Sequence, residues 1–178
     1  FNERDISIDV IARVVPKLRH RNATGSGVFI RPCLPFAFAD DVRSETVERM
    51  LDDRLRIAAV IETSVGSFQC WIPLAGPLQS VEPELSVAAS EVIADRYDTD
   101  IGVAHRDAFG RAPGFRNRKL KHEHDGKFPL VEMSNRHCGF RGYDRMLLAD
   151  ARRIVGNQLK PPGKRSAGGV RTTPDEAI

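Results

Sequence analysis

The sequence predicts an α+β fold in which a mixed β-sheet is flanked by helices. Two observations favour this class. Apolar residues recur at helical intervals over 5–20 and 80–97, and segments with strand character are mixed with these helices without strict alternation. The runs 56–63 and 68–74, joined by the turn "SVGS", have the length and pattern of a β-hairpin. The chain of 178 residues is long enough for one domain with a sizeable core.

The N-terminal part carries one helix signal, one turn and two strands. Pro16 is expected to bend or interrupt the helix over 5–20. The turn "NATGSG" leads into a short strand, "VFIRP", and a second strand at 34–42 runs into two carboxylates. Ser44 is a plausible N-cap for a helix that reaches about Arg54.

The C-terminal part is less regular. An irregular segment at 98–127 precedes a strand at 128–133 and a last helix at 143–156. From Lys160 onward Pro and Gly are frequent and apolar periodicity is absent, which is typical of a linker. We therefore expect one domain over 1–158 and a flexible, basic tail over 159–178.

Composition excludes some classes of protein. No run approaches eighteen apolar residues, so no membrane span is expected. The three cysteines have no CxxC spacing, which fits a reducing cytoplasm and argues against a disulfide framework. The formal net charge is only +3, so the distribution of charge along the chain is more informative than its sum.

Two adjacent carboxylates, Asp40 and Asp41, end the strand at 34–42. Burying both would cost several kcal/mol each, unless they are paired or bind a metal. If the strand ends or bulges at Asp40, both could lean toward one cation, an arrangement that Mg²⁺ prefers. Alternatively, Asp41 caps the following helix and Asp40 is exposed.

A basic segment, "RAPGFRNRKLKHEH", suggests where phosphates would bind. Its Pro113-Gly114 turn would fix the backbone, and Asn117 could donate to a phosphate or a sugar. The basic residues that could contact phosphates are Arg111, Arg116, Arg118, Lys119 and Lys121. Together with Asp40, Asp41 and a third carboxylate, Asp98 or Asp100, they would form a metal-assisted phosphoryl-transfer site. The alternative is a solvated surface loop.

Other chemistry-bearing residues are interpreted as structural. The spacing of His122, His124, His137 and Cys138 matches no common zinc pattern. Trp71 is expected to pack in the core, although an aromatic ring could also stack on a base. Cys70 is expected to be a small buried residue, not a nucleophile.

Five of these stretches, in this order, resemble the RepB-like plasmid primases of the archaeo-eukaryotic primase superfamily. They are "LRHRNATGSGVFIRP", "FADDV", "VIETSVGSFQCWIPL", "DRYDTDIG" and "GRAPGFRNRK". The resemblance implies a sheet flanked by helices with an RRM-like unit. It also implies synthesis of short primers from nucleoside triphosphates on single-stranded DNA, with Mg²⁺ or Mn²⁺, in plasmid or mobile-element replication in the bacterial cytoplasm.

The same resemblance assigns the site residues. The metal-binding, catalytic carboxylates fall on Asp40, Asp41 and Asp100, with Asp98 as the alternative to Asp100. The residues implied to bind nucleotide or phosphate are Gln69, Arg111, Arg116, Asn117, Arg118 and Lys119. Gln69 stands where the wider superfamily has a His, and an amide cannot carry positive charge.

Primases of this type usually need a second, helical region. The chain is therefore expected to be the catalytic module of a larger protein, with helicase or relaxase functions in the same or another chain. A different class of function stays open, namely a single-stranded nucleic-acid-binding module that has kept the fold and lost catalysis.

Overall fold

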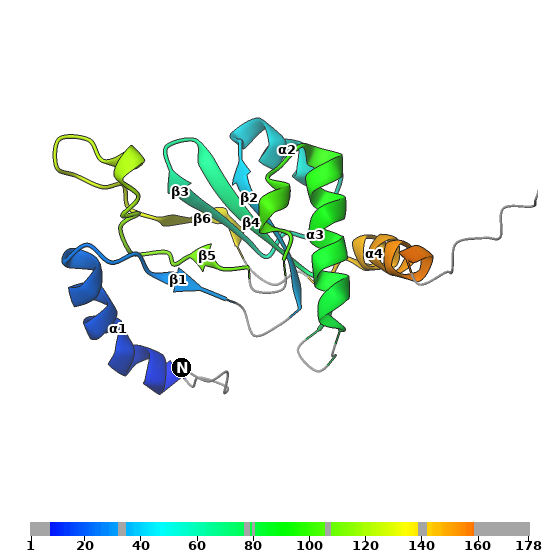
Figure 1. Cartoon of the computed structure of the whole chain (residues 1–178), viewed down its shortest axis with the longest axis horizontal. Helices are drawn as coiled ribbons and strands as arrows, with labels where there is room; N and C mark the ends of the chain where they lie inside the picture. The colour runs from blue at the N-terminus through cyan, green and yellow to red at the C-terminus, as the bar shows by residue number, and fades with distance from the viewer. Residues whose placement is uncertain are drawn as a thin grey trace, which may run out of the picture.

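A computed structural model describes residues 8–31, 35–76, 79, 81–105, 108–138 and 142–158. Four strands form the main sheet in the order β2-β4-β3-β6, and β1 pairs with β5 in a second sheet (Figure 1). The strands are β1 (Phe29–Ile30), β2 (Phe36–Val42), β3 (Ala59–Ser64), β4 (Ser67–Pro73), β5 (Gly110–Arg111) and β6 (Glu132–Cys138). The helices are α1 (Ile8–Ala23), α2 (Ser44–Asp52), α3 (Pro83–Tyr97) and α4 (Arg145–Gln158), with 3-10 turns η1 (Ile101–Val103) and η2 (Leu120–His122). The α+β class is confirmed, but every strand pairing within these residues is antiparallel, where a mixed sheet was expected.

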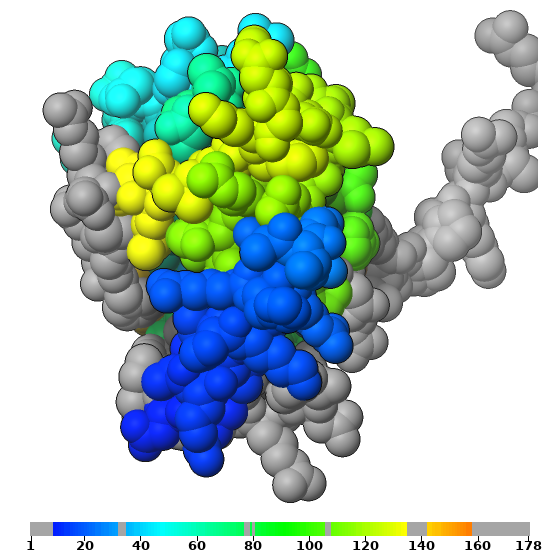
Figure 2. Space-filling view, turned by 90° about the vertical axis from the view of Figure 1, so that its left-hand side faces the viewer, coloured from blue at the N-terminus to red at the C-terminus, as the bar shows by residue number. Residues whose placement is uncertain are grey.

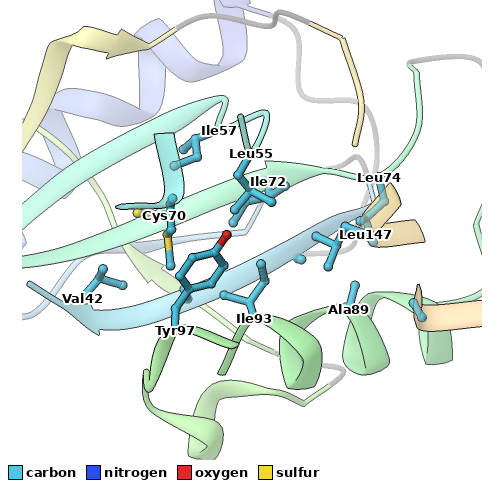
Figure 3. Close-up of a cluster of buried hydrophobic side chains, with 14 of the residues drawn as sticks. Val42, Leu55, Ile57, Cys70, Ile72, Leu74, Ala89, Ile93, Tyr97 and Leu147 are labelled. Atoms are coloured by element: carbon cyan, nitrogen blue, oxygen red, sulfur yellow. The ribbon is translucent and has the colours of Figure 1, made fainter. Parts of the chain in front are cut away.

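The alternation along β2 and β4 divides the apolar residues between two cores. Cys70 and Ile72 point to the face that is covered by α2, α3 and α4, where they meet Ile93, Tyr97 and Leu147 (Figure 3). On the opposite face, a smaller core contains Phe38, Ile61, Trp71 and Val131. The rings of Phe38 and Trp71 stack there with their centroids 4.2 Å apart, so the expected packing of Trp71 in the core is confirmed.

The small β1–β5 sheet lies against this second face. A Cβ atom on Gly110 would lie 2.5 Å from Cζ2 of Trp71 and 2.9 Å from Nε2 of Gln69. Only a residue without a side chain allows β5 to approach β4 so closely. The close approach brings the basic segment over the end of β2.

Helix α1 stands apart from both cores. Figures 1 and 2 show it projecting beyond the β1–β5 sheet, and among the described residues none of its apolar side chains joins either buried cluster. The helix continues through Pro16, where a bend or interruption was expected. Its last turn is held by contacts to the basic segment, which are described below.

Two boundaries differ from the sequence prediction for identifiable reasons. Ser44 is the first residue of α2, and Arg43 takes the N-cap position without a side-chain hydrogen bond. The strand expected at 128–133 begins only at Glu132, because the backbone at 129–131 pairs with the basic segment instead of with β3. The expected tail, 159–178, lies outside the described residues.

None of the helices in the described part of the chain is long and apolar enough to cross a membrane.

Candidate active site

A β-bulge at the end of β2 brings Asp40 and Asp41 together. Ala39 pairs with Cys70 and Val42 pairs with Phe68, so two residues of β2 face the single residue Gln69 of β4. The extra residue, Asp41, has a left-handed backbone with φ of 52°. The bulge returns Val42 to the same core as Ala39, although three positions separate them.

Asp40 lies in an environment that disfavours its charge. Burial raises the pKa of its carboxyl group, and the charges of Asp41 and Asp100 raise it further. The backbone N–H of Asp41 and the ammonium of Lys119 partly oppose this rise. Asp40 in turn opposes the lowering of the Arg111 pKa that burial causes. Two carboxylates and two cations are therefore within electrostatic reach of Asp40.

The other carboxylates already have protein partners. Asp41 is exposed, and its Oδ1 accepts a hydrogen bond of 3.1 Å from the Ser67 hydroxyl. Oδ1 of Asp100 accepts a 2.8 Å bond from the N–H of Gly102 and so caps η1. Asp98 is exposed, with a left-handed backbone at the end of α3. In the described residues, no three His, Cys, Asp or Glu side chains are arranged to hold a metal ion.

The donor set nevertheless fits a hard divalent cation. Mg²⁺ is usually held by one or two carboxylates, and its remaining ligands are waters and substrate phosphates. Asp40 and Asp41 provide two adjacent carboxylates that repel each other, and a cation between them would relieve that repulsion.

Two buried amides fix the backbone of the basic segment. Nε2 of Gln69 donates to the carbonyl of Arg111 at 2.8 Å, and Oε1 accepts from its N–H at 3.0 Å. The side chain of Asn22 repeats the pattern on Arg116, with bonds of 3.0 Å to its carbonyl and 2.8 Å from its N–H. A third amide, that of Asn117, donates to the carbonyl of Thr63 at 2.8 Å. Side-chain amides therefore bond the backbone of the segment at Arg111 and Arg116, and Asn117 attaches it to Thr63.

These bonds change what the predicted nucleotide-binding residues can do. Gln69 and Asn117 are each 1% exposed, and their amides are occupied by backbone groups. Direct contact of Gln69 with a nucleotide, or of Asn117 with a phosphate or sugar, was expected from the sequence. In this structure both residues instead hold the backbone of the segment.

The basic side chains fall into two groups. Arg111 and Lys119 lie in the field of Asp40, and the guanidinium of Arg111 stacks 4.8 Å from the centroid of Phe29. Arg116 donates to the carbonyl of Phe128 at 2.7 Å. Arg118 donates to the last carbonyls of α1, those of residues 22 and 23, at 2.7 and 3.0 Å. Of the basic residues that were predicted to bind phosphate, Arg111 and Lys119 are therefore close to Asp40, whereas Arg116 and Arg118 are engaged with backbone carbonyls.

Two residues near the site, Asn22 and His122, were not predicted from the sequence to belong to it. Asn22 was taken for a turn residue, and no local pattern indicates its partner 94 positions away. His122 lies near the same charges, since burial and then the cations of Lys121, Lys119 and Arg111 lower its pKa while Asp41 raises it.

The remaining polar residues singled out in the sequence are two histidines and two cysteines. The imidazole of His124 is exposed and pairs with its neighbour Asp125 at 3.0 Å. The side chains of His137 and Cys138 lie outside the described part of the chain. Burial, and to a smaller extent the charge of Asp40, raise the pKa of the Cys70 thiol to about 12, so Cys70 is not a nucleophile at neutral pH.

Comparison with known proteins places this chain among relatives of known family. The model of the RepB DNA-primase N-terminal domain matches residues 2–143. Mobilization protein A of Escherichia coli is 31% identical over 123 residues, which are 67% of this chain and 17% of that protein. A DNA primase of Acidithiobacillus ferrooxidans is 28% identical over 137 residues, or 72% of this chain and 38% of that protein. The chain thus spans well under half the length of either relative.

Two solved structures have a similar fold. One is the catalytic domain of primase RepB' in complex with initiator DNA, which matches with a TM-score of 0.73 and 26% identity over 85% of this chain and 78% of that one. The other is primase RepB', with a TM-score of 0.75 and 26% identity over 85% of this chain and 52% of that one.

Proposed function

Because this chain belongs to the RepB DNA-primase N-terminal domain family, we propose that it is the catalytic module of a DNA primase. It makes short primers from nucleoside triphosphates on single-stranded DNA by metal-dependent nucleotidyl transfer. Its relatives include a primase catalytic domain bound to initiator DNA and a mobilization protein, which supports a role in plasmid or mobile-element replication.

The observation that carries the proposal is the bulge that puts Asp40 and Asp41 side by side, in the field of Lys119 and Arg111. A fold that needed only stability would not retain a half-buried carboxylate beside a second one, because the repulsion and desolvation are unfavourable. The pair becomes favourable when a divalent cation and a triphosphate are bound, since the cation neutralises the carboxylates and the basic groups neutralise the phosphates.

Asp40 and Asp41 would hold Mg²⁺ or Mn²⁺, and Asp100 is the third carboxylate near them. When bound, the metal would neutralise the charge that develops on the phosphoryl oxygens. Arg111 and Lys119 would bind the triphosphate, with Arg116 and Arg118 contributing further positive charge. Gln69 and Asn117 would position the backbone from which these cations extend.

The test is incorporation of labelled nucleotide on a single-stranded template, with Mg²⁺ or Mn²⁺ added or chelated. Asp40→Ala and Asp41→Ala should each lower incorporation by two powers of ten or more, because metal and base effects are each worth roughly 10²-fold. Glu45→Ala removes an exposed carboxylate from α2 and should leave the rate unchanged. Full activity in the Asp40→Ala, Asp41→Ala double variant would show that the pair is not catalytic.

The second candidate function is a nucleic-acid-binding module without catalysis. The basic residues of segment 111–124 support it, and it does not need the carboxylates. It predicts that single-stranded DNA binds and that no incorporation occurs under any metal condition. Because the chain covers only 17% and 38% of its two relatives, the incorporation assay should include a longer form with any helical, helicase or relaxase region that accompanies it.

A further inference from the structure

Helix α1 presents a stripe of positive charge. Arg13, Lys17 and Arg21 follow each other at intervals of four residues, so they lie on one face of the helix, and all three are exposed. At 1.5 Å per residue, they span about 12 Å along the axis. Asp9 is the only acidic residue in α1.

This stripe is rigidly connected to the candidate active site. Asn22, in the last turn of α1, bonds both backbone groups of Arg116, and the guanidinium of Arg118 bonds the carbonyls of Asn22 and Ala23. A cation at the C-terminus of a helix is also favoured by the helix dipole. These bonds fix the position of the C-terminal end of α1 relative to the basic segment, although 94 residues separate Asn22 from Arg116.

Two regions of the chain differ in charge. In Figure 2, α1 and the segment that follows β5 share the face that is turned toward the viewer. The basic residues of 8–31 and 108–131 are Arg13, Lys17, Arg19, Arg21, Arg31, Arg111, Arg116, Arg118, Lys119, Lys121 and Lys127, and the acidic ones are Asp9, Glu123 and Asp125. By contrast, the segment 81–105, which includes α3, contains six acidic residues and one Arg: Glu82, Glu84, Glu91, Asp95, Asp98, Asp100 and Arg96.

We propose that the face of α1 formed by Arg13, Lys17 and Arg21 binds the phosphate backbone of the DNA template and leads the strand to the carboxylate pair. This inference rests on the proposed function, since it names where the template of that reaction lies. A stripe of about 12 Å with three cations can contact up to about three successive phosphates of a single strand. The binding is independent of sequence, because the stripe offers only charge.

An anionic membrane is the other class of partner for a basic helix, and the structure favours it less. A helix that lies on a lipid surface needs a broad apolar face to insert. On α1 the apolar residues Val14, Val15 and Leu18 are already partly buried, and Ile11 is 45% exposed. Among the described side chains of α1, Ile11 is the only large apolar one that is exposed, so they offer no broad apolar face for lipid.

Binding of a fluorescent oligo(dT) to the full chain, measured over a series of salt concentrations without nucleotide or metal, tests the proposal. The variant Arg13→Gln/Lys17→Gln/Arg21→Gln should weaken binding. It should also flatten the slope of log affinity against log salt by about 2, because each phosphate contact on a single strand contributes roughly 0.7. The matched control Arg145→Gln/Arg152→Gln/Arg153→Gln removes three charges from exposed positions of α4 and should keep the wild-type slope.

A charge-conserving variant, Arg13→Lys/Lys17→Arg/Arg21→Lys, separates lost charge from altered folding and should bind as the wild type does. An unchanged slope in the neutral variant, or equal losses in the neutral and charge-conserving variants, would overturn the proposal. It would also be overturned if the neutral variant lost binding to phosphatidylserine vesicles and kept its binding to DNA. Since this assay needs no turnover, its outcome is separate from that of the incorporation assay.

Discussion

The side-chain amide of Gln69 bonds the backbone of Arg111 as a neighbouring strand would. It donates to the carbonyl and accepts from the N–H, at 2.8 and 3.0 Å, inside the protein. This pair joins the small sheet to the main sheet, beside the bulge that carries Asp40 and Asp41. The geometry of the candidate site therefore depends on an amide that is buried beneath it.

Replacing Gln69 with Leu should destabilise the fold strongly. The change leaves two buried backbone groups of Arg111 without partners, and each such group costs about 1–3 kcal/mol. We expect the free energy of unfolding in urea to fall by about 2–6 kcal/mol. The control Gln79→Ala alters an exposed amide and should change it by no more than about 0.5 kcal/mol. A Gln69→Leu variant as stable as that control would show that the amide does not join the sheets.

Asn22→Ala should release the basic segment locally. Its side chain holds both backbone groups of Arg116, and the adjacent peptides are exposed enough for a protease to reach once they open. We expect trypsin to cleave faster after Arg116 and Arg118, because cleavage follows local opening. Asn157→Ala, in an exposed position of α4, is the matched control. Equal cleavage rates in the two variants would contradict the role of Asn22.

Stability without metal should depend on pH through Asp40. Because burial raises its pKa, the folded state binds the proton more tightly than the unfolded chain does. The favourable contribution of Asp40 is complete below its unfolded pKa of about 3.9, and it is lost as the pH rises through the raised folded value. In the presence of a chelator, Asp40→Asn should therefore raise the melting temperature near neutral pH. The gain should shrink as the pH falls toward about 4.

Metal provides the check on that experiment. Mn²⁺ should raise the melting temperature of the wild type, because it binds the folded state, and it should have little effect on Asp40→Asn. A wild type that is indifferent to Mn²⁺ up to millimolar concentration would contradict metal binding at this pair. Glu48→Gln, an exposed change on α2, controls for nonspecific effects of charge.

Asp100 and Asp98 should differ in activity. Asp100→Asn can keep the hydrogen bond to Gly102 while it removes the charge near Asp40. If that charge is catalytic, incorporation should fall by roughly 10²-fold or more, with little change in stability. Asp98→Gly suits the left-handed backbone at the end of α3 and should stay active. A fully active Asp100→Asn would leave Asp100 as a cap of η1 alone.

Gly110→Ala should disturb the contact between the two sheets. The new methyl group would lie 2.5 Å from the Trp71 ring, so β5 must move away from β4. We expect a loss of about 1–3 kcal/mol in unfolding free energy, together with lower incorporation. Gly156→Ala, in α4, meets nothing within 4 Å and should gain up to about 1 kcal/mol. Equal stability of the two variants would contradict the close packing at Gly110.

Much of the fold could be predicted from the sequence, because its signals are local. The hairpin at 56–63 and 68–74, the helix ending near Tyr97 and the last helix all depend on periodicity within one segment, and the structure contains each of them. The strand expected at 128–133 was misplaced. Its residues 129–131 pair with the basic segment, and pairing with β3 begins only at Glu132. Which of two strands a peptide group chooses depends on residues far away in the chain.

For the site, the sequence was enough to predict the candidate groups and the family: an adjacent pair of carboxylates, a downstream Asp and a cluster of cations. The tertiary structure decided how they are arranged. The bulge at Asp41 follows from Ala39 and Val42 both entering one core, which a regular strand cannot achieve at a spacing of three. The roles of Gln69 and Asn22 follow from burial, because an amide enclosed with backbone groups must bond them. Both causes act between distant segments, so no local pattern of residues encodes them.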